Sequence, residues 1–302
     1  MQPENQHLLR IRSKKPGYIL ITADTFHLSN FTFTFNNLTT MKLKIYQIDA
    51  FTDKLFGGNP AAVCPLEEWL PDELLQNIAK ENNLAETAFY VPNGDEYLLR
   101  WFTPTVEVDL CGHATLAAAF VLFSLENHSG STIRFYSPRS GELIVTKKDN
   151  LLTLDFPTDI ITKVEPLPFL TDAFDSMPIE ILKGKTDYLY VFENEESIRT
   201  ISAHMENIAK IPARGVIITA PGNDVDFVSR FFAPQSGVIE DPVTGSAHTT
   251  LTPYWAKKLN KKTLTAIQLS ERQGHLICTY LKDRVEISGH ARHYLTGEIF
   301  VE

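Results

Sequence analysis

The sequence is poor in cysteine, has no excess of basic residues and contains no long apolar run. Its three cysteines, Cys64, Cys111 and Cys278, are odd in number and widely spaced, which argues against a disulfide framework and favours a reducing compartment, with the cytoplasm as the default. The formal charge is −9, from 28 Lys and Arg against 37 Asp and Glu, so nucleic acid is not an expected partner. The longest strongly apolar run, Ala114 to Phe123, is about half of the ~20 residues that a membrane-spanning helix needs, so no membrane partner is expected.

Motifs for nucleotides and metals are also missing. The segment Asp241–Ser246 lacks the spacing and the lysine of a phosphate-binding P-loop, which argues against nucleotide binding. Cys111 and His113 are close in sequence, but no second cysteine stands at metal-ligand spacing, and His290-x-x-His293 fits strand and turn residues equally well. The sequence therefore predicts no metal and no organic cofactor.

The first 40 residues differ from the rest in charge. Four basic residues against two acids give residues 1–40 a net charge of +2, which leaves −11 for residues 41–302. A Lys-Lys pair and the apolar piece Tyr18–Ala23 imitate a secretory signal, but the apolar piece is too short and lacks a cleavage site. A regular strand pattern begins at Met41, so we expect residues 1–40 to be an extension outside the core fold.

The chain from Met41 onward has the pattern of a globular α/β protein. Hydrophobic residues make up 43% and charged residues 22% of the sequence, which allows a substantial core. Short strands dominate and a few helices interrupt them; one helix is expected to start at Pro71-Asp72-Glu73 and to be ended by Asn82-Asn83. The segment Gly112–Ser124 leaves no polar face, so it is expected to be a helix buried at the centre of a lobe.

An internal near-repeat indicates two similar lobes. Trp101–Val108 aligns with Phe231–Val238 at a constant offset of 130, with Phe, Pro and Val in common. After a three-residue insertion, Gly112 aligns with Gly245, and each glycine opens a helical stretch. A repeat of this kind usually means one structural unit used twice, although chance similarity of two short segments stays open at this point.

The two helix starts are candidate anion-binding sites. A helix that begins at glycine presents free backbone N–H groups and the positive end of its dipole, and an anion can approach closely. Two such starts, at Gly112 and Gly245, would face each other across a cleft and hold a substrate carboxylate, whereas either one alone fits an ordinary capping glycine.

Two acids near these motifs are candidates for proton transfer. Glu86 is the one charge in the apolar, strand-like piece Leu84–Phe89, where burial would raise its pKa toward neutrality; an edge glutamate facing water is the alternative. Asp241 precedes the second helix start, where it could be a cap or a catalytic group. Cys111 also admits a thiol nucleophile and thus a hydrolase, but no acyl-transfer triad is visible.

Together these motifs resemble the PhzF-like proteins of phenazine biosynthesis, which are relatives of diaminopimelate epimerase. The resemblance runs from about Met41 to the C-terminus, and four ordered segments carry it: Asp49–Thr52 with Phe56–Val63, Asn83–Phe89, Arg100–Pro104 leading into Cys111–Ala117, and Phe231–Pro234 leading into Glu240–Ala247. It implies two α/β lobes, each a mostly antiparallel sheet rolled around a central helix, with the active site between them and commonly a homodimer.

The resemblance also assigns roles to residues. It implies that Glu86 is the proton-transfer acid/base, that His113 and Asp241 assist or position it, and that Gly112, Gly245 and Ser246 hold the substrate carboxylate. Diaminopimelate epimerases use two opposed cysteines, but here Cys111 stands opposite Asp241, so the two-thiol racemase mechanism is not carried over. Pro253, eight residues into the second helix, is a further departure that is expected to kink or shorten it.

These observations give a definite set of expectations. Residues 1–40 form the extension, 41–157 the N-terminal lobe and 158–302 the C-terminal lobe, and return of the last strand to the first lobe is left open. The expected function is a cofactor-independent isomerase that moves a proton on a small carboxylate-bearing metabolite. The alternative is a small-molecule-binding or regulatory protein without catalysis on the same scaffold, because a fold does not guarantee chemistry.

Overall fold

The computed structural model describes residues 9–12, 18–21, 26–28, 31–33 and 41–301 and divides the chain into two compact units. One unit comprises Met1–Lys42 with Phe300–Glu302. Most of residues 1–40 lie outside the described residues, so their place outside the core fold stays a prediction. Its described hairpins pair β1 (Leu9–Arg12) with β2 (Tyr18–Ile21) and β3 (Phe26–Leu28) with β4 (Phe31–Phe33). The other unit, Leu43–Ile299, holds the remaining elements and the candidate site.

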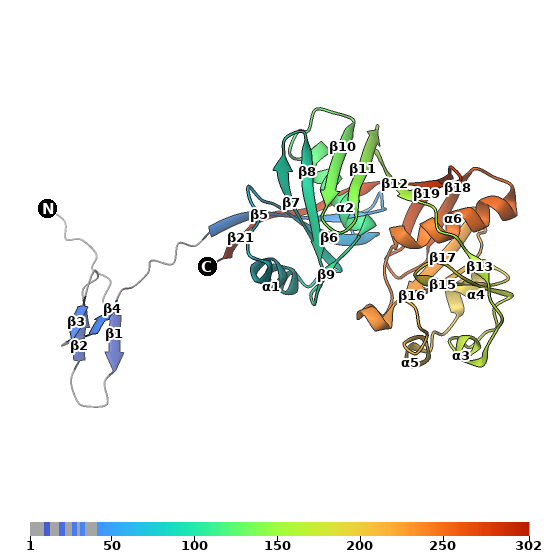
Figure 1. Ribbon diagram of the computed structural model, residues 1–302, viewed down its shortest axis with the longest axis horizontal. Coiled ribbons are helices and arrows are strands. Elements are labelled where there is room, and N and C mark those ends of the chain that lie inside the picture. The colour runs from blue at the N-terminus through green and yellow to red at the C-terminus, as the bar shows by residue number, and fades with distance from the viewer. Residues whose placement is uncertain (1–8, 13–17, 22–25, 29–30, 34–40, 302) are drawn as a thin grey trace. The chain divides into compact units, whose positions relative to one another are not determined.

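The unit Leu43–Ile299 is built from two halves, each with a helix packed on strands (Figure 1). The first half contains β5 (Met41–Ala50), β6 (Asn59–Pro65), α1 (Asp72–Asn82), β7 (Glu86–Asn93), β8 (Glu96–Phe102), β9 (Glu107–Val108), α2 (Gly112–Ser124), β10 (Thr132–Ser137), β11 (Gly141–Lys148) and β12 (Leu151–Pro157). The second half contains β13 (Thr162–Lys163), α3 (Pro168–Thr171), β14 (Glu180–Lys183), β15 (Asp187–Val191), α4 (Glu195–Thr200), α5 (Met205–Ile208), β16 (Gly215–Pro221), β17 (Phe227–Phe232), η1 (Pro234–Ser236), α6 (Gly245–Leu259), β18 (Thr263–Gln268), β19 (Gly274–Tyr280) and β20 (Arg284–Gly289). The last strand is β21 (Ala291–Val301).

The same series of strand pairings occurs twice. In the first half, β6 and β7 are parallel, β7 and β8 antiparallel, β8 and β10 parallel, and β10, β11 and β12 successively antiparallel. In the second half, β15 and β16 are parallel, β16 and β17 antiparallel, β17 and β18 parallel, and β18, β19 and β20 successively antiparallel. The near-repeat in the sequence thus reflects one structural unit used twice, and the predicted two-lobed α/β class is confirmed.

Strand pairing also joins the two halves. β12 pairs antiparallel with β20, from Leu152 opposite Gly289 to Pro157 opposite Arg284. β21 lies between β20 and β5 in the order of the sheet, so the last strand is the neighbour of the first strand of this unit. The lobe boundary predicted after residue 157 coincides with the end of β12 and stays a prediction.

The helix α2 is buried on nearly all sides, as its sequence predicts. Only Phe120 and Ser124 of its residues are not buried, and the core around it includes Trp101, Phe135 and Leu154. Burial of apolar surface contributes about 25 cal/mol for each Å² removed from water, so the burial of α2 makes a large contribution to the stability of the first half. In the part of the chain that the structure describes, no helix is both long and apolar enough to span a bilayer.

The expectation that Pro253 kinks or shortens the second helix is wrong as to its length. α6 continues through Pro253 to Leu259. A proline removes the N–H group that would bond the carbonyl four residues earlier, here Thr249. The backbone N–H of Asp159 donates to that carbonyl at 3.2 Å, so a segment outside the helix supplies the missing donor. The Asp159 carboxylate in turn accepts from the Thr250 hydroxyl at 2.8 Å.

Replacing Asp159 tests how far its carboxylate holds this segment against α6; the backbone N–H that bonds the Thr249 carbonyl is kept in the variant. Asp159→Ala is expected to lower the free energy of unfolding by about 1–2 kcal/mol, because the Thr250 hydroxyl and the Lys185 backbone N–H lose their acceptor. Urea denaturation measures the change. Asp155→Ala is the matched control, since it removes an aspartate whose pairing with Arg284 is solvent-exposed and is expected to contribute less than about 1 kcal/mol. Equal losses in the two variants would contradict the role given to Asp159.

Candidate active site

Two helix N-termini meet in the middle of the unit Leu43–Ile299. α2 begins at Gly112 after Cys111, and α6 begins at Gly245 after Thr244; neither preceding residue makes a side-chain capping hydrogen bond. A Cβ atom placed on Gly112 would lie 3.4 Å from the Cα of Gly245, so the two backbones are almost in contact. The first N–H groups of a helix have no partner within it, so both sets of donors converge on one place.

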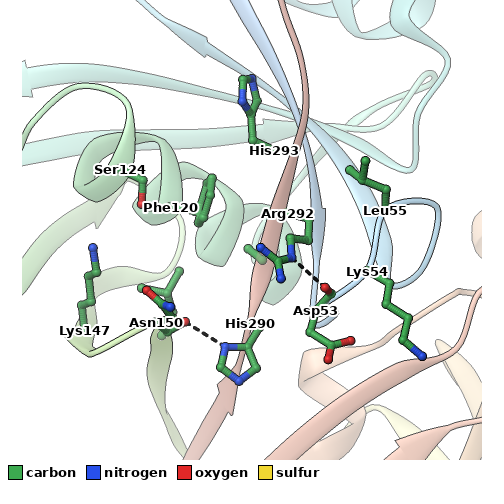
Figure 2. A pocket seen from close by; sticks show the side chains of 12 residues that line it. Asp53, Lys54, Leu55, Phe120, Ser124, Lys147, Asn150, His290, Arg292 and His293 are labelled. Carbon is green, nitrogen blue, oxygen red and sulfur yellow. Dashed lines mark hydrogen bonds between the residues drawn. The ribbon is translucent and has the colours of Figure 1, made fainter.

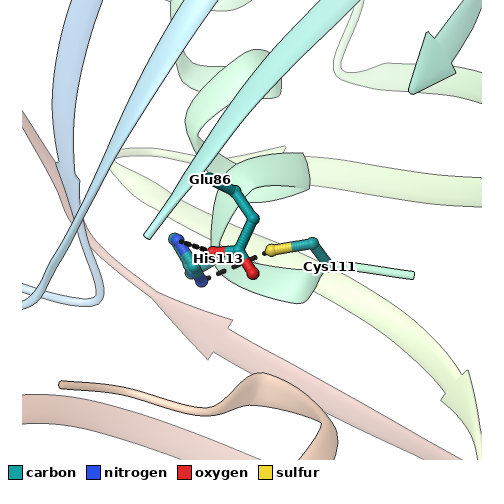
Figure 3. Close-up of side chains that lie close together, drawn as sticks. All are labelled: Glu86, Cys111 and His113. Carbon is teal, nitrogen blue, oxygen red and sulfur yellow. Dashed lines mark hydrogen bonds and ion pairs between the residues drawn. The ribbon is translucent and has the colours of Figure 1, made fainter. Parts of the chain in front are cut away.

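The side chain of Glu86 lies beside the start of α2 (Figure 3). Glu86 is the first residue of β7 and pairs with Ala61 of β6, and its side chain is 17% exposed. Its Oε2 lies 3.2 Å from Nε2 of His113, and one ligand atom each of Glu86, Cys111 and His113 lies within 4.8 Å of the others. Burial, reinforced by the charge of Asp241, raises the pKa of Glu86 to about 8.

The amide of Asn59 connects His113 to the second half. Its Nδ2 lies 2.8 Å from Oδ1 of Asp241, 3.0 Å from the carbonyl of Val243 and 3.2 Å from Nδ1 of His113. A carboxylate and a carbonyl only accept, so the group that faces them is the NH₂, whose two hydrogens are shared among the three neighbours. The amide nitrogen cannot accept, so Nδ1 of His113 faces it with a lone pair and not with a proton. In the neutral imidazole the proton is then on Nε2, which faces Glu86. Burial lowers the pKa of His113 to about 3, so the ring is neutral at physiological pH.

Backbone geometry explains how Asn59 reaches this position. Gly58 has a φ of +62°, and a Cβ on it would lie 2.1 Å from the carbonyl oxygen of Ala50, so only glycine fits. Arg272, from the second half, donates to the carbonyl oxygens of Gly57 and Gly58 at 2.9 and 2.8 Å. The loop before β6 is thus fixed from both halves, and Asn59 is fully buried at its end.

Asp241 is held by hydrogen bonds on both carboxylate oxygens. Oδ1 accepts from Asn59, and Oδ2 accepts from the Thr244 hydroxyl at 2.5 Å. Gln268 supports the same turn, since its amide donates to the carbonyl of Asp241 at 2.8 Å and accepts from the N–H of Thr244 at 2.9 Å. Burial raises the pKa of Asp241 to about 6, although the bonds from Thr244 and Asn59 act in the opposite direction.

The thiol of Cys111 is unsuited to nucleophilic attack. Burial raises its pKa well above the ordinary value, and the charge of Glu86 adds to this effect, so the thiol stays protonated. This observation argues against the hydrolase alternative.

The cluster of Glu86, Cys111 and His113 offers a donor set that a metal ion could use. However, a ligating nitrogen must offer a free lone pair. The lone pair on Nδ1 of His113 faces the Asn59 amide, and Nε2 carries the ring proton, so neither nitrogen is free to bind a metal ion. The arrangement therefore fits proton transfer better than metal binding. Among residues 41–301, His290 and His293 belong to no such cluster.

The structure brings the predicted site residues together. Glu86 contacts His113, Asn59 connects His113 with Asp241, and Gly112 faces Gly245. Ser246 lies next to Gly245 in the first turn of α6, and its side chain is half-buried. Three supporting residues, Asn59, Thr244 and Gln268, were not assigned a role from the sequence. Asn59 lies within the motif segment Phe56–Val63 and Thr244 within Glu240–Ala247, and this position could have pointed to them. Gln268 ends β18, and no sequence pattern marks it.

Comparisons with known proteins agree with these features. The model of the family described as phenazine biosynthesis-like protein, PhzC-PhzF, matches residues 48–297. A Pseudomonas aeruginosa protein that is named an uncharacterized isomerase is 51% identical over 260 residues, which cover 86% of this chain and 99% of that protein. A crystal structure of a PhzF-family protein from Enterococcus faecalis is 46% identical, with a TM-score of 0.84, and the match covers 86% of this chain and 100% of that one. A P. aeruginosa structure titled as a predicted epimerase, 19% identical with a TM-score of 0.68 over 86% of this chain and 100% of its own, supports the fold alone.

The raised pKa of Glu86 gives a stability prediction. The folded state holds this proton more tightly than the unfolded state, whose carboxyl titrates near the ordinary value, so the contribution of Glu86 is fully present at low pH and is lost as pH rises toward about 8. Glu86→Gln removes the titration. The variant is therefore expected to match the wild type near pH 4 to 5 and to exceed its free energy of unfolding by on the order of 3 kcal/mol at about pH 9.

Urea denaturation at a series of pH values checks this expectation. Glu81→Gln, on the exposed side of α1, is the control for loss of one carboxylate. A difference between Glu86→Gln and wild type that stays constant from acid to alkaline pH would show that the carboxyl is not perturbed in the folded state.

Proposed function

The chain belongs to the phenazine biosynthesis-like protein family, and from this premise we propose that it is an isomerase that moves a proton on a small carboxylate-bearing metabolite, with Glu86 as the acid/base group. The observation that carries the proposal is a buried carboxyl beside two facing helix N-termini that have no side-chain caps. The names of the curated relatives support isomerisation as the reaction type.

The helix N-termini are suited to holding the carboxylate of the substrate. The free N–H groups at the starts of α2 and α6 point to one place, and the dipoles of both helices favour a negative charge there. Gly112 and Gly245 have no side chains that would keep an anion away from the backbone. Ser246, in the first turn of α6, is the proposed hydroxyl donor to the same carboxylate.

Glu86 is suited to both removing and returning a proton. With a pKa of about 8, a minority of molecules carry the carboxylate at neutral pH and act as base, and the protonated group that results is a competent acid. In the proposed reaction a C–H bond next to an activated carbon breaks, its electron pair forms a new double bond, and the neighbouring double bond shifts. Glu86 then gives the proton to the far carbon, so atoms and electrons balance without a co-reactant.

His113 and Asp241 are proposed as positioning residues. Nε2 of the neutral imidazole lies 3.2 Å from Oε2 of Glu86, and neither atom has a hydrogen-bond partner among the residues that the structure describes. A small rotation would let the Nε2 proton stabilise the carboxylate form at the moment of abstraction. Asp241 holds Asn59, and Asn59 holds the tautomer of His113, so the orientation depends on both halves of the unit. We also propose that the protein forms a homodimer, as the family resemblance implies, and that it is located in the cytoplasm.

Deuterium incorporation tests the proposal directly. The protein is incubated in D₂O with a panel of small unsaturated carboxylic acids, including a cyclohexadiene carboxylate, and the products are analysed by mass spectrometry. Wild type is expected to label at least one compound, and Glu86→Gln is expected to lower the rate by at least about 100-fold, because the transferring group is lost. Glu81→Gln should label at the wild-type rate.

The outcomes separate catalysis from binding. Label in the wild type that persists in Glu86→Gln would remove Glu86 from the mechanism. Binding of a compound without label in any protein would instead support the small-molecule-binding alternative.

The pH dependence of the labelling rate is a separate prediction. Because the carboxylate form of Glu86 is the base, the rate is expected to rise with pH and to level off above about 8, the pKa to which burial raises this group. The measurement is the initial rate of exchange between about pH 5 and 9 under saturating substrate. A rate that falls over this range would mean that a protonated group performs the first step.

A further inference from the structure

A cavity of about 890 Å³ lies in the first half, and none of the candidate active-site residues lines it. Its walls come from the loop after β5, the last turns of α2, the turn between β11 and β12, and the start of β21 (Figure 2). Its polar lining includes Asp53, Lys54, Lys147, Asn150, His290 and Arg292. A volume of this size is typical of a small-molecule site.

The lining of the cavity has the opposite charge to the chain. Lys54, Lys147 and Arg292 are basic residues, and Asp53 is the one acid in the lining. The chain as a whole has a formal charge of −9. A cleft lined by one sign of charge concentrates its field and raises the local concentration of ligands of the opposite sign. The cavity therefore favours anions in a protein whose net charge repels them.

Arg292 differs from the other arginines of residues 41–301. Each of the others forms an ion pair with an aspartate or glutamate, as Arg230 does with Glu240 and Arg284 with Asp155; the rest are Arg100, Arg134, Arg139, Arg199, Arg214 and Arg272. Arg292 donates only its Nε, to the backbone carbonyl of Asp53 at 2.7 Å. Its two terminal NH₂ groups are left without a partner among the described residues, so they can bind an anion in the bidentate way that guanidinium favours.

The opposite wall of the cavity is held in place and carries a second cation. His290 contacts the carbonyl of Asn150 through Nδ1 at 3.0 Å, which joins the start of β21 to the β11–β12 turn (Figure 2). Lys147, half-buried at the end of β11, has its Nζ 5.6 Å from the ring centroid of Phe123 and forms no ion pair in the described part of the chain. Cations on two walls suit a ligand that carries more than one negative group.

From this geometry we propose that the cavity between α2, the β11–β12 turn and β21 binds a small polyanion, a molecule with at least two phosphate or carboxylate groups, at a site separate from the helix N-termini. Arg292 contributes the bidentate contact and Lys147 the point charge from the facing wall. Lys54, on the loop after β5, adds a third positive charge.

Isothermal titration calorimetry with inorganic pyrophosphate and with citrate tests the proposal. We expect one molecule to bind per chain, and we expect Arg292→Gln and Lys147→Gln each to weaken binding by at least about ten-fold, because each removes a charge-assisted contact. Higher salt should also weaken it. Tighter binding of pyrophosphate would identify a phosphate ligand, and tighter binding of citrate a polycarboxylate.

Two controls make the test specific. Lys148→Gln removes the neighbouring lysine, which points to the other side of β11 and does not line the cavity, so it should leave binding unchanged. Ser246→Ala should also leave it unchanged, since Ser246 belongs to the helix N-termini. Failure of both anions to bind below about 10 mM would overturn the proposal, as would binding that depends on Ser246 and not on Arg292. A dimer that dissociates in Arg292→Gln without anion binding would assign this face to a subunit contact instead.

Discussion

The N-termini of α2 and α6 approach each other at Gly112 and Gly245 until their backbones almost touch, and the surrounding residues are arranged around that approach. Each N-terminus carries partial positive charge, so bringing two together is unfavourable unless negative charge lies between or beside them. Glu86 contacts His113 in the first turn of α2, and Asp241 accepts from Thr244 at the start of α6, and burial raises the pKa of both acids. With a pKa of about 8, Glu86 is mostly protonated at neutral pH, so Asp241 is the main negative charge of this pair in the free protein, and a bound carboxylate would add a second.

The same burial has different consequences for neighbouring groups. It keeps His113 neutral, keeps the Cys111 thiol protonated and moves Glu86 toward the range in which a proton can be taken up and released at neutral pH. Since the contact of Asn59 fixes the tautomer of His113, the direction of the imidazole proton is set by a residue that is not ionisable. The site thus combines a group with a perturbed pKa with fixed neutral hydrogen-bonding groups that orient it.

Much of the fold could be predicted from the sequence because it follows from local patterns. The apolar segment Gly112–Ser124 required burial, Pro71 and Asn83 bound α1, and the repeat at an offset of 130 corresponds to a repeated series of strand pairings. Glu86 and Asp241 were accessible as acids in unusual sequence surroundings. Asn59 and Gln268 were not, because a buried amide has no sequence pattern of its own and becomes meaningful only when the two halves face each other. The continuation of α6 past Pro253 could not be predicted for a related reason, since the compensating donor, the backbone N–H of Asp159, comes from a distant segment.

The position of β21 between β20 and β5 has a consequence for the synthesis of the protein. β5 is made early and β21 last, and β12 likewise waits for β20, its antiparallel partner across the two halves. Until β20 and β21 have been made, the nascent first half has open strand edges that can pair with other chains. Because these contacts join segments far apart in sequence, folding must close long loops before it gains them, which slows the final step. Completion of the first half therefore waits for synthesis of the second half and of β21.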